Sequence, residues 1–441
     1  MVPSEPSLPG GAIASAAFGG YALAGRLAAP LIERYLRRRL AQGKEDAARF
    51  GERLGRAGMA RPDGPLLWVH GASVGEAVSA LPLIERLRHD WPKATVLVTS
   101  GTVTSARLMA ERLPPGAIHQ YVPVDLPQAV AGFLDHWRPD LGLFVESEFW
   151  PNLLRGAAAR GTRLVLLNGR ISADSYRGWG RARPLIEGLL GCFALIAARS
   201  PEDRDRLVGL GAAPVLTPGD LKAAAPPLKA DAAELARLRA EFQGRPCWLA
   251  ASTHPGEEKI AGETHRALKG RFPGLLTLLA PRHPHRGAAI RRELEAVGLA
   301  VAQRSRGETV GGGTDIYLAD TLGELGLWYS LAEVVLVGGS LIAHGGHNLL
   351  EPAKLDRAIL TGPHTANFAR MAAEMAEAGA LREVGGPAAL TAAVADLLAD
   401  PAGRQALATA AGGYAAAQAG VLDRIMEALA PLLHEAVRKE G

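Results

Sequence analysis

The chain of 441 residues has little cysteine, few aromatic residues and no long uninterrupted apolar run. Its two cysteines, Cys192 and Cys247, lie in or beside apolar segments without metal-ligand spacing, so we expect buried thiols in a reducing compartment. Aromatic residues make up 5% and glycines number 52, which fits many strand-to-helix turns better than an all-β fold. The sequence also lacks a dinucleotide-binding G-x-G-x-x-G and a Walker A loop, which argues against a dehydrogenase and a P-loop enzyme.

The length and net charge of the chain limit the number of domains and the kinds of partner to expect. A chain with 48% hydrophobic and 21% charged residues can bury large cores, and its length suggests two or three domains. Lysine and arginine number 49 against 45 aspartates and glutamates, a formal net charge of +4. This mild excess suits anionic ligands or lipid head groups and is too weak to indicate nucleic acid as a partner.

The first 48 residues consist of an apolar part followed by a basic part. Residues 10–25 are uncharged, with about 15 residues of apolar sequence, fewer than the roughly 18 to 20 that a spanning helix needs. No basic segment precedes them, so they make a poor secretory signal. The pattern predicts a helix lying on an anionic membrane surface, and the alternative is a basic helix packed on the protein's own core. The basic residues are Arg34, Arg37, Arg38, Arg39 and Lys44.

From residue 66 onward, short apolar runs alternate with segments of helical period. This alternation indicates βαβ units with parallel sheets. We therefore predict two Rossmann-like α/β domains, residues 49–222 and 243–441, joined by a linker and hinge at residues 223–242. The candidate strands are residues 66–70, 95–100, 118–123, 141–146, 163–168 and 193–198 in the first series, and 246–252, 275–281, 300–305, 315–320, 333–340 and 358–363 in the second.

Chemically active residue types gather in the turns after these strands. Open α/β sheets bind ligands beyond the carboxyl ends of their strands, so we expect the active site in the cleft between the two domains. Glu146 and Glu148 end one predicted strand two residues apart, which would place them on the same face. Lys222 lies at the domain junction, where its ammonium group could meet a phosphate or a carboxylate.

The segment "HGASVGE", residues 70–76, matches two different motifs. It fits the G-x-S-x-G nucleophile elbow of serine hydrolases, but it follows the first strand of its domain, and the one HGGG-like element lies far downstream, which is the wrong order. Ser73 and Glu76 also have the S-x-x-E spacing of a capping box. The small residues around the turn leave room for a ligand at a helix N-terminus, which makes Glu76 a candidate general base.

Two loops of the second series have cationic or helix-opening residues. His254 opens a predicted helix, a weak signal when taken alone. Residues 281–286, "PRHPHR", place several cationic side chains at a strand end and suggest phosphate recognition. The cluster has no carboxylate nearby, which disfavours His283 and His285 as metal ligands.

The strongest single feature of the second series is a glycine-rich loop. Glycines at residues 338–339 follow a predicted strand, and polar residues at 345–352 precede a predicted helix. This arrangement fits a nucleotide site in which Glu351 accepts hydrogen bonds from ribose hydroxyls.

Taken together, these loops resemble one family, the 3-deoxy-D-manno-octulosonic acid (Kdo) transferases of lipopolysaccharide assembly. The resemblance implies a GT-B fold, with two Rossmann-like domains facing a central cleft and an N-terminal membrane-associating helix before them. It also implies inverting transfer of Kdo from CMP-Kdo to a lipid A precursor (lipid IVA), without a metal or other cofactor, at the cytoplasmic face of the bacterial inner membrane. It covers residues 49–363 and is carried by "FGERLG", "HGASVGE", "VESEFWPNLL", "NGRIS", "GDLK", "PRHPHR", "DTLGELGLWYSLA" and "GGSLIAHGGHNLLEPA".

The resemblance assigns roles to residues of this chain. Glu76 matches the general base that deprotonates the acceptor hydroxyl, and Glu146 and Lys222 match residues that support the transition state. Cationic Lys222 and Arg282 can offset charge that builds on the departing CMP phosphate. The positions that match contacts to CMP are Pro281, Arg282, Leu322, Gly323, Glu324, Asn348, Leu349, Leu350 and Glu351. Further candidate substrate contacts are Ser73, Gly75, Glu148, His254 and Ser340.

The chain departs from the family pattern in two places, and two other functions stay open. Leu349 stands where proline is common in the family, and the N-terminal segment is richer in glycine and alanine than is usual there. The alternatives are a GT-B transferase or epimerase that uses a UDP-sugar, and a catalytically silent nucleotide-sugar-binding protein at the membrane. The expected partners are CMP-Kdo, a lipid A precursor and an anionic membrane surface, without nucleic acid.

Overall fold

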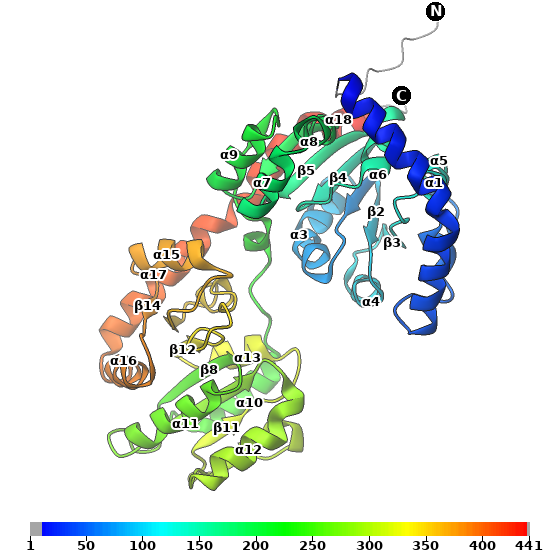
Figure 1. The fold of residues 1–441 in the computed structure, drawn as a ribbon. Coiled ribbons are helices and arrows are strands. Elements are labelled where there is room, and N and C mark those ends of the chain that lie inside the picture. Colours follow the sequence, from blue (N-terminus) through cyan, green and yellow to red (C-terminus); the bar gives the residue numbers. More distant parts are fainter. Residues whose placement is uncertain (1–10, 439–441) are drawn as a thin grey trace, which may run out of the picture. The chain divides into compact units, whose positions relative to one another are not determined.

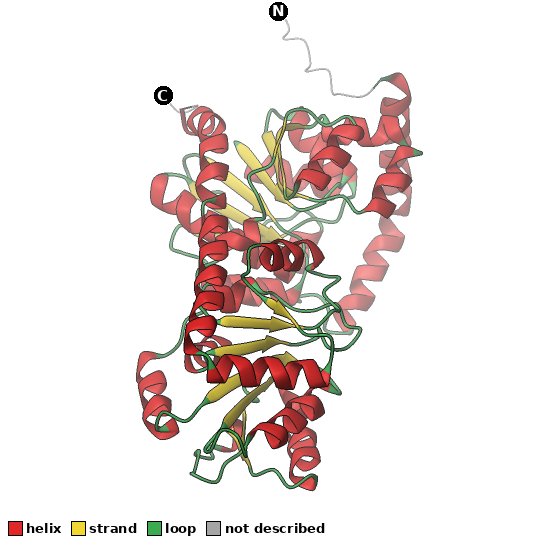
Figure 2. Cartoon of the chain, turned by 90° about the vertical axis from the view of Figure 1, so that its left-hand side faces the viewer, coloured by secondary structure: helices red, strands yellow, loops and turns green. Residues whose placement is uncertain are grey.

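The computed structural model describes residues 11–438, which divide into two compact units. Residues 11–225 together with residues 419–438 belong to the first unit, and Pro226–Gln418 form the second. Each unit has a parallel sheet with helices packed on its faces (Figures 1 and 2). Two Rossmann-like α/β units are thus present, as the alternation of apolar runs predicts.

The sheet of the first unit has the strand order β3-β2-β1-β4-β5-β6-β7. Strand β1 pairs with both β2 and β4, so the direction of strand addition reverses beside β1. Ligands bind at such a reversal, beyond the carboxyl ends of the strands, so the segments after β1 and β4 are where a site belongs. The strands are β1 (Leu66–His70), β2 (Thr95–Ser100), β3 (Ala117–Tyr121), β4 (Leu141–Val145), β5 (Arg163–Gly169), β6 (Phe193–Ala198) and β7 (Val215–Leu216).

Aromatic packing fixes the core of this unit. Trp68 of β1 is fully buried and meets Phe144 of β4 edge to face, with ring centroids 4.8 Å apart, and Phe133 at 5.1 Å. Aromatic pairs prefer such tilted geometry, which ties β1 and β4 rigidly to helix α5. The helices of the unit are α1 (Ala12–Ala41), α2 (Phe50–Arg53), α3 (Val74–Asp90), α4 (Val103–Arg112), α5 (Pro127–Trp137), α6 (Pro151–Ala159), α7 (Ala173–Gly180), α8 (Arg183–Leu190), α9 (Pro201–Gly209), the short 3₁₀ helix η1 (Leu221–Ala224) and α18 (Val421–Arg438).

The second unit repeats the design with the strand order β10-β11-β9-β8-β12-β13-β14. Here β8 pairs with both β9 and β12, so the reversal lies beside β8. Its strands are β8 (Cys247–Thr253), β9 (Leu276–Pro281), β10 (Val301–Gln303), β11 (Ile316–Leu318), β12 (Val334–Val337), β13 (Ala358–Thr361) and β14 (Arg382–Glu383). Its helices are α10 (Ala232–Phe242), α11 (Glu257–Leu268), η2 (Pro284–Arg286), α12 (Gly287–Ala296), η3 (Arg304–Arg306), α13 (Leu325–Leu331), α14 (Leu350–Ala353), α15 (Ala369–Glu377), α16 (Pro387–Ala399) and α17 (Pro401–Ala419).

The boundaries of the units differ from the predicted division in two places. Residues 223–242 are predicted to be a linker, but α10 packs on α13 within the second unit. The last helix, α18, packs on β4 and η1 of the first unit rather than on the second. It does so because one apolar face is buried there, formed by Val421, Ile425, Leu429 and Leu433 at intervals of four residues.

Helix α1 packs along α5, α6 and α8, and one of its faces joins the core of the first unit. Ala14 and Phe18 are buried there, and the Arg155 guanidinium lies over the Phe18 ring at 4.4 Å from its centroid. Within residues 11–438, no helix has both the length and the apolarity that crossing a bilayer requires. Residues 1–10, the start of the segment predicted to associate with a membrane, lie outside the described range.

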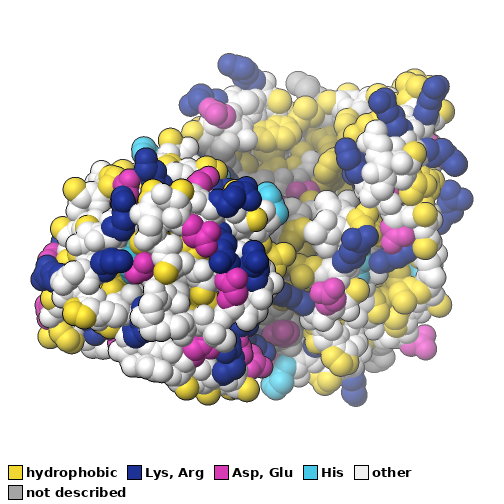
Figure 3. Space-filling model, turned by 90° about the horizontal axis from the view of Figure 1, so that it is seen from below, with side chains coloured by type: hydrophobic (Ala, Val, Ile, Leu, Met, Phe, Trp, Pro, Cys, Tyr) yellow, Lys and Arg dark blue, Asp and Glu magenta, His cyan; other side chains and the backbone are white. Residues whose placement is uncertain are grey.

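Charged side chains of both signs lie near one another on one face of the protein (Figure 3). On the face shown in Figure 3, lysine and arginine side chains are interspersed with aspartate and glutamate.

Candidate functional site

A cavity of about 540 Å³ opens at the carboxyl ends of β1, β4 and β5 in the first unit. It brings together three predicted site residues from two separate loops, Glu76, Glu146 and Glu148. The rest of its lining is aromatic, hydroxyl-bearing or cationic, with one aliphatic residue: Ser147, Phe149, Trp150, Arg170, Ile171, Ser172, Ser175 and Trp179. Carboxylates accept hydrogen bonds from hydroxyl groups and aromatic faces pack on apolar ones, so this lining suits a sugar.

The turn after β1 is a complete capping box. The Ser73 hydroxyl accepts from the Glu76 backbone N–H at 3.3 Å and donates to Glu76 Oε1 at 2.8 Å. The other carboxylate oxygen, Oε2, accepts from the backbone N–H groups of Ala72 at 2.7 Å and Ser73 at 3.3 Å. The local sequence therefore holds the Glu76 carboxylate at the N-terminus of α3.

Two glycines of this turn have different roles. A Cβ at Gly71 would lie 3.1 Å from both the Ala77 nitrogen and the Glu76 Cβ, so a side chain there would press on the first turn of α3. A Cβ at Gly75 would meet nothing nearer than the Ser73 hydroxyl, 4.0 Å away. The space beside Gly75 is therefore open, which leaves room for a ligand next to Glu76.

Glu146 follows β4 with a left-handed backbone, φ 65°, and its carboxylate accepts from the Lys222 ammonium group at 2.7 Å. The Lys222 side chain is 44% exposed and that of Glu146 15% exposed, so the carboxylate is sheltered while the ammonium group faces solvent. The two residues lie 76 positions apart in the sequence. The structure thus unites two of the three residues predicted to be catalytic.

Asn168, at the end of β5, is a positioning residue that the sequence analysis missed. Its side-chain oxygen accepts from the Leu221 backbone N–H at 2.9 Å, and the Asp220 side chain accepts from the Lys222 N–H. These bonds fix the short helix η1 and with it the base of the Lys222 side chain. Asn168 has φ 54°, a conformation that asparagine tolerates better than most residues. The available sequence signal was the Asn168-Gly169 pair, which is typical of a turn.

The prediction that Glu146 and Glu148 share one strand face is wrong. Strand β4 ends at Val145, and the left-handed turn at Glu146 sends the two carboxylates toward different partners. Glu148 lies 3.8 Å from Nε2 of the buried His70 and accepts a hydrogen bond from the Trp150 indole N–H. Burial raises the pKa of the Glu148 carboxyl, but the contacts with His70 and Trp150 outweigh this and leave the pKa below its usual value.

His70 is itself held by the core. Its Nδ1 lies 2.9 Å from the Thr99 hydroxyl, which also accepts from the Trp68 indole N–H at 2.8 Å. A proton on Nε2 of His70 faces the Glu148 carboxylate, whereas a bare lone pair there would repel it. His70 therefore connects the packed core to the cavity, although the sequence indicated it only as a strand residue.

In the second unit, a buried carboxylate organises the glycine-rich loop after β12. Glu257, the first residue of α11, is fully buried. Its two oxygens accept from four backbone N–H groups, those of His254, Gly339, Ser340 and Leu341, at 2.7 to 3.1 Å. The N–H groups of the predicted nucleotide loop are thus already occupied by a side chain of the protein, Glu257, which the sequence alone did not indicate as an anchor.

Ser340, which is predicted to contact the substrate, uses its side chain within the protein in this structure. Its side chain is fully buried, donates to the Val337 carbonyl and accepts from the Gly362 N–H. A Cβ on Gly362 would lie 2.1 Å from the Ser340 carbonyl oxygen, so the two loops are in direct contact. Ser340 therefore links the ends of β12 and β13 and has no free group for a ligand.

The predicted nucleotide residues after this loop form one turn. Asn348 accepts from the Leu350 N–H at 3.1 Å and donates to Glu351 Oε1 at 3.3 Å. The Leu349 and Leu350 side chains are 1% and 3% exposed, so a ligand could reach these two only through their backbone. Burial raises the pKa of Glu351. Asn348 and Glu351 are therefore the polar side chains that this turn offers to a ribose.

The remaining predicted donor residues lie on two further loops of the second unit. Arg282 follows β9, is exposed, and donates its backbone N–H to the Thr253 carbonyl at 3.0 Å. Leu322 is 80% exposed beside Gly323, which has φ 82°. The Glu324 carboxylate is held by Arg304 at 2.6 Å, and this hydrogen bond lowers its pKa. Arg282 and the Leu322–Gly323 turn are thus open to a ligand, while Glu324 anchors its loop.

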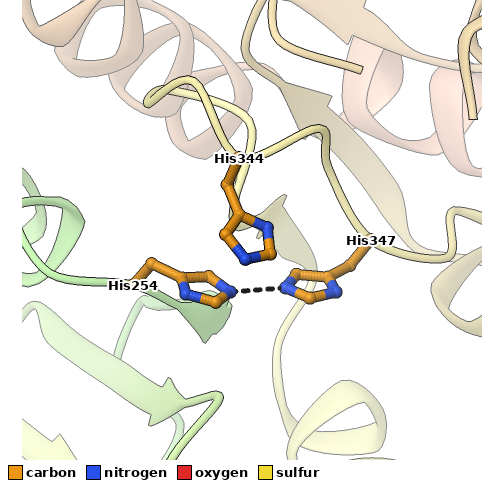
Figure 4. A group of neighbouring side chains, drawn as sticks. All are labelled: His254, His344 and His347. Carbon is orange, nitrogen blue, oxygen red and sulfur yellow. Dashed lines mark hydrogen bonds between the residues drawn. The ribbon is translucent and has the colours of Figure 1, made fainter. Parts of the chain in front are cut away.

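His254 does not stand alone. Its Nε2 lies 2.8 Å from Nε2 of His347, and its ring stacks on that of His344 with centroids 3.8 Å apart (Figure 4). The sequence pattern does not indicate this cluster, because its members come from loops about ninety residues apart.

Known proteins resemble this chain along most of its length. The family model described as "3-Deoxy-D-manno-octulosonic-acid transferase (kdotransferase)" matches residues 48–225. A 3-deoxy-D-manno-octulosonic acid transferase of Bordetella pertussis is 39% identical over 93% of this chain and 98% of its own. One of Haemophilus influenzae is 34% identical over 88% of this chain and 92% of its own.

The fold of the chain is similar to that of a solved structure. A glycosyltransferase from Rickettsia africae superposes with a TM-score of 0.56 at 11% identity and covers 84% of this chain and 99% of its own. This likeness shows the GT-B fold alone, whereas the sequence relatives show the family. The chain is a glycosyltransferase that belongs to the 3-deoxy-D-manno-octulosonic acid transferase family.

Proposed function

We propose that this protein transfers Kdo from CMP-Kdo to a lipid A precursor, lipid IVA, with inversion at the anomeric carbon. The observation that carries the proposal is the cavity that gathers Glu76 and Glu146 at the carboxyl edge of one sheet, with the Lys222 ammonium group bound to Glu146. A base and a charge-paired cation beside an open, sugar-sized space are what an inverting transfer needs.

In the proposed reaction, Glu76 takes the proton from the acceptor hydroxyl as that oxygen attacks the anomeric carbon of Kdo. The bond from this carbon to the CMP phosphate breaks on the opposite face, and CMP leaves with the electron pair. Lys222, held by Glu146, stabilises the negative charge that develops. This division of roles is supported by the geometry of the turn, which presents the Glu76 carboxylate to the cavity while the Gly75 side of the turn stays open.

The second unit is proposed to bind the CMP part of the donor. Arg282 would contact the phosphate, the exposed Leu322–Gly323 turn would cover the base, and Asn348 with Glu351 would bind the ribose. The raised pKa of Glu351 fits a carboxyl group in a sheltered site that hydrogen-bonds a hydroxyl pair.

The donor is tested by product analysis. The purified protein is incubated with a tetra-acylated lipid A precursor and either CMP-Kdo or a panel of UDP-sugars, and the lipid products are weighed by mass spectrometry. We expect a mass gain of one or more Kdo residues with CMP-Kdo and none with the UDP-sugars. A product from a UDP-sugar alone would contradict the proposal, and donor binding without any product would favour a silent binding protein.

Membrane association is proposed to use the exposed face of α1. Leu23, Leu27, Leu31 and Tyr35 recur every four residues and are 57 to 74% exposed. They therefore form one apolar stripe, and the exposed Arg34, Arg37 and Arg38 lie at the end of the helix beside it. An apolar stripe bordered by arginines is typical of a helix that lies in the head-group region of an anionic bilayer.

Replacing Leu27 and Leu31 together by glutamate should weaken binding to anionic vesicles at least about tenfold, because each buried leucine contributes about 2 kcal/mol. Binding is measured by co-sedimentation with phosphatidylglycerol-containing vesicles, with phosphatidylcholine vesicles as the neutral reference. Val208→Glu is the matched control, since Val208 is 52% exposed on α9 of the same unit. Equal binding by the double variant and the control would remove α1 as the contact surface.

A further inference from the structure

Three histidines from two loops of the second unit converge at the carboxyl edge of β8 and β12. His254 follows β8, and His344 and His347 belong to the glycine-rich loop after β12. One ring nitrogen from each can be chosen so that all three lie within 4.8 Å of one another (Figure 4). We propose that this triad is a binding site for a divalent transition-metal cation of the zinc type.

The donor set decides which metals fit. Imidazole nitrogen suits zinc, nickel, cobalt and copper, whereas calcium and magnesium need oxygen ligands, and the triad offers none from its side chains. Three protein ligands with a fourth position left to water is a common arrangement for a zinc ion that is not purely structural. His254 is buried and His344 is exposed, so the triad has a fixed base and an open side.

The present hydrogen bond shows how a metal would enter. Nε2 of His254 and Nε2 of His347 are 2.8 Å apart and share one proton. A metal at about 2.0 to 2.1 Å from each nitrogen needs those atoms to separate slightly. The proton moves to the Nδ1 atom of its own ring, so no proton has to leave. His344 completes the set by turning about the glycines that follow it, Gly345 and Gly346, with φ 106° and 76°.

Some charged groups near the triad favour a bound cation and others disfavour it. The Arg282 and His283 side chains face His254 and disfavour an added cation. The buried carboxylate of Glu257 favours one, because it accepts the backbone N–H groups of His254 and Gly339 directly beneath the two loops. Glu258 is neutralised by Arg286 at 2.6 Å. Because these charges oppose one another, the charges alone would not bind a divalent cation. The site therefore favours cations that bind imidazole nitrogen strongly.

The site would also connect to the rest of the second unit. His347 directly precedes Asn348, and Asn348 caps the turn proposed to bind the donor nucleotide. A metal held by His254 and His347 would fix this loop to β8. Metal binding itself rests only on the triad and is independent of the proposed function.

Cobalt(II) is the probe, because its visible absorption reports nitrogen ligation in a tetrahedral site. The full-length protein, without a histidine tag, is titrated with cobalt(II) in the absence of donor and acceptor, and zinc(II) is then added. We expect one equivalent of cobalt to bind saturably and zinc to displace it. His344→Ala and His347→Ala should each weaken cobalt binding by about tenfold or more, since even the loss of an outer partner of a metal ligand costs that much.

The neighbouring histidines supply the controls. His283→Ala and His285→Ala remove imidazoles from the adjacent loop and should not weaken cobalt binding, because neither residue belongs to the triad. His344 is exposed, so its loss does not threaten the fold, and near-ultraviolet circular dichroism checks each variant. An absence of saturable cobalt binding would overturn the proposal, as would a loss in His283→Ala equal to that in His344→Ala.

Discussion

Replacing Glu76 by glutamine should lower kcat for transfer by about 10²- to 10⁴-fold, the range that a general base contributes. Glutamine keeps the length of the side chain and serves at the third helical position of a capping box, so α3 should start as before. It also keeps one oxygen for the Ala72 N–H, the shorter of the two backbone contacts. Transfer is followed with radiolabelled Kdo, and donor affinity by calorimetry, where we expect little change.

Ser73→Ala is the matched control for this experiment. It removes the hydroxyl that bonds Glu76 but leaves the carboxylate and its backbone contacts in place. Loss of such a cap costs about 0.5 to 2 kcal/mol of stability, so the thermal midpoint should fall while kcat changes by less than about tenfold. A nucleophilic serine predicts the opposite, complete loss of activity in Ser73→Ala and labelling of Ser73 by a fluorophosphonate. Unchanged transfer by Glu76→Gln would remove this residue as the base.

Much of the fold could be predicted because parallel strands are buried on both faces and therefore read as continuous apolar runs. Strands β1, β2 and β6 have the bounds that the sequence indicates, and the other predicted strands differ by a few residues. Strands β7 and β14 were missed, since two residues are too short to leave a pattern. Helix α18 was assigned to the wrong unit, because an amphipathic face shows that a helix packs but not on which sheet.

In the candidate site, contacts between residues close in sequence could be predicted, whereas contacts between distant residues could not. The Ser73–Glu76 capping box spans three residues, so its spacing alone predicts the bonds that form. The Glu146–Lys222 pair depends on how β4 and η1 meet, and this follows from packing. The resemblance to the family named both residues but not their contact. The two-residue period of a strand gave a wrong orientation for Glu148, because the left-handed backbone at Glu146 ends the strand before Glu148 is reached.

The glycine-rich loop of the second unit was the hardest part to predict. The sequence predicts that Gly338 and Gly339 belong to a nucleotide site, yet a Cβ on Gly338 would lie 2.7 Å from the Ser252 carbonyl oxygen, so close packing alone demands glycine there. The N–H groups beyond it bind Glu257. A sequence cannot distinguish an internal carboxylate from an external anion, because both are bound by the same backbone donors.

Replacing Lys222 by methionine should lower kcat by about 10²-fold or more, the cost of removing one preorganised group that stabilises developing charge. The free energy of unfolding should change little, because an ion pair whose lysine is 44% exposed contributes about 1 kcal/mol or less to stability. Steady-state kinetics with CMP-Kdo gives the first quantity and chemical denaturation the second. Lys93→Met, at an exposed position of the same unit, is the control and should leave both unchanged.

A double-mutant cycle with Glu146→Gln then separates two roles of Lys222. If the ammonium group only holds the Glu146 carboxylate in place, Lys222→Met should have no further effect in a Glu146→Gln background. If it also stabilises charge on the leaving phosphate, the double variant should be slower than Glu146→Gln alone, and Lys222→Arg should recover part of the loss by restoring a cation. We expect the second pattern, because the ammonium group remains open to solvent beyond its 2.7 Å contact with Glu146 and has donors to spare. Transfer within a few-fold of the native rate in Lys222→Met would exclude both roles.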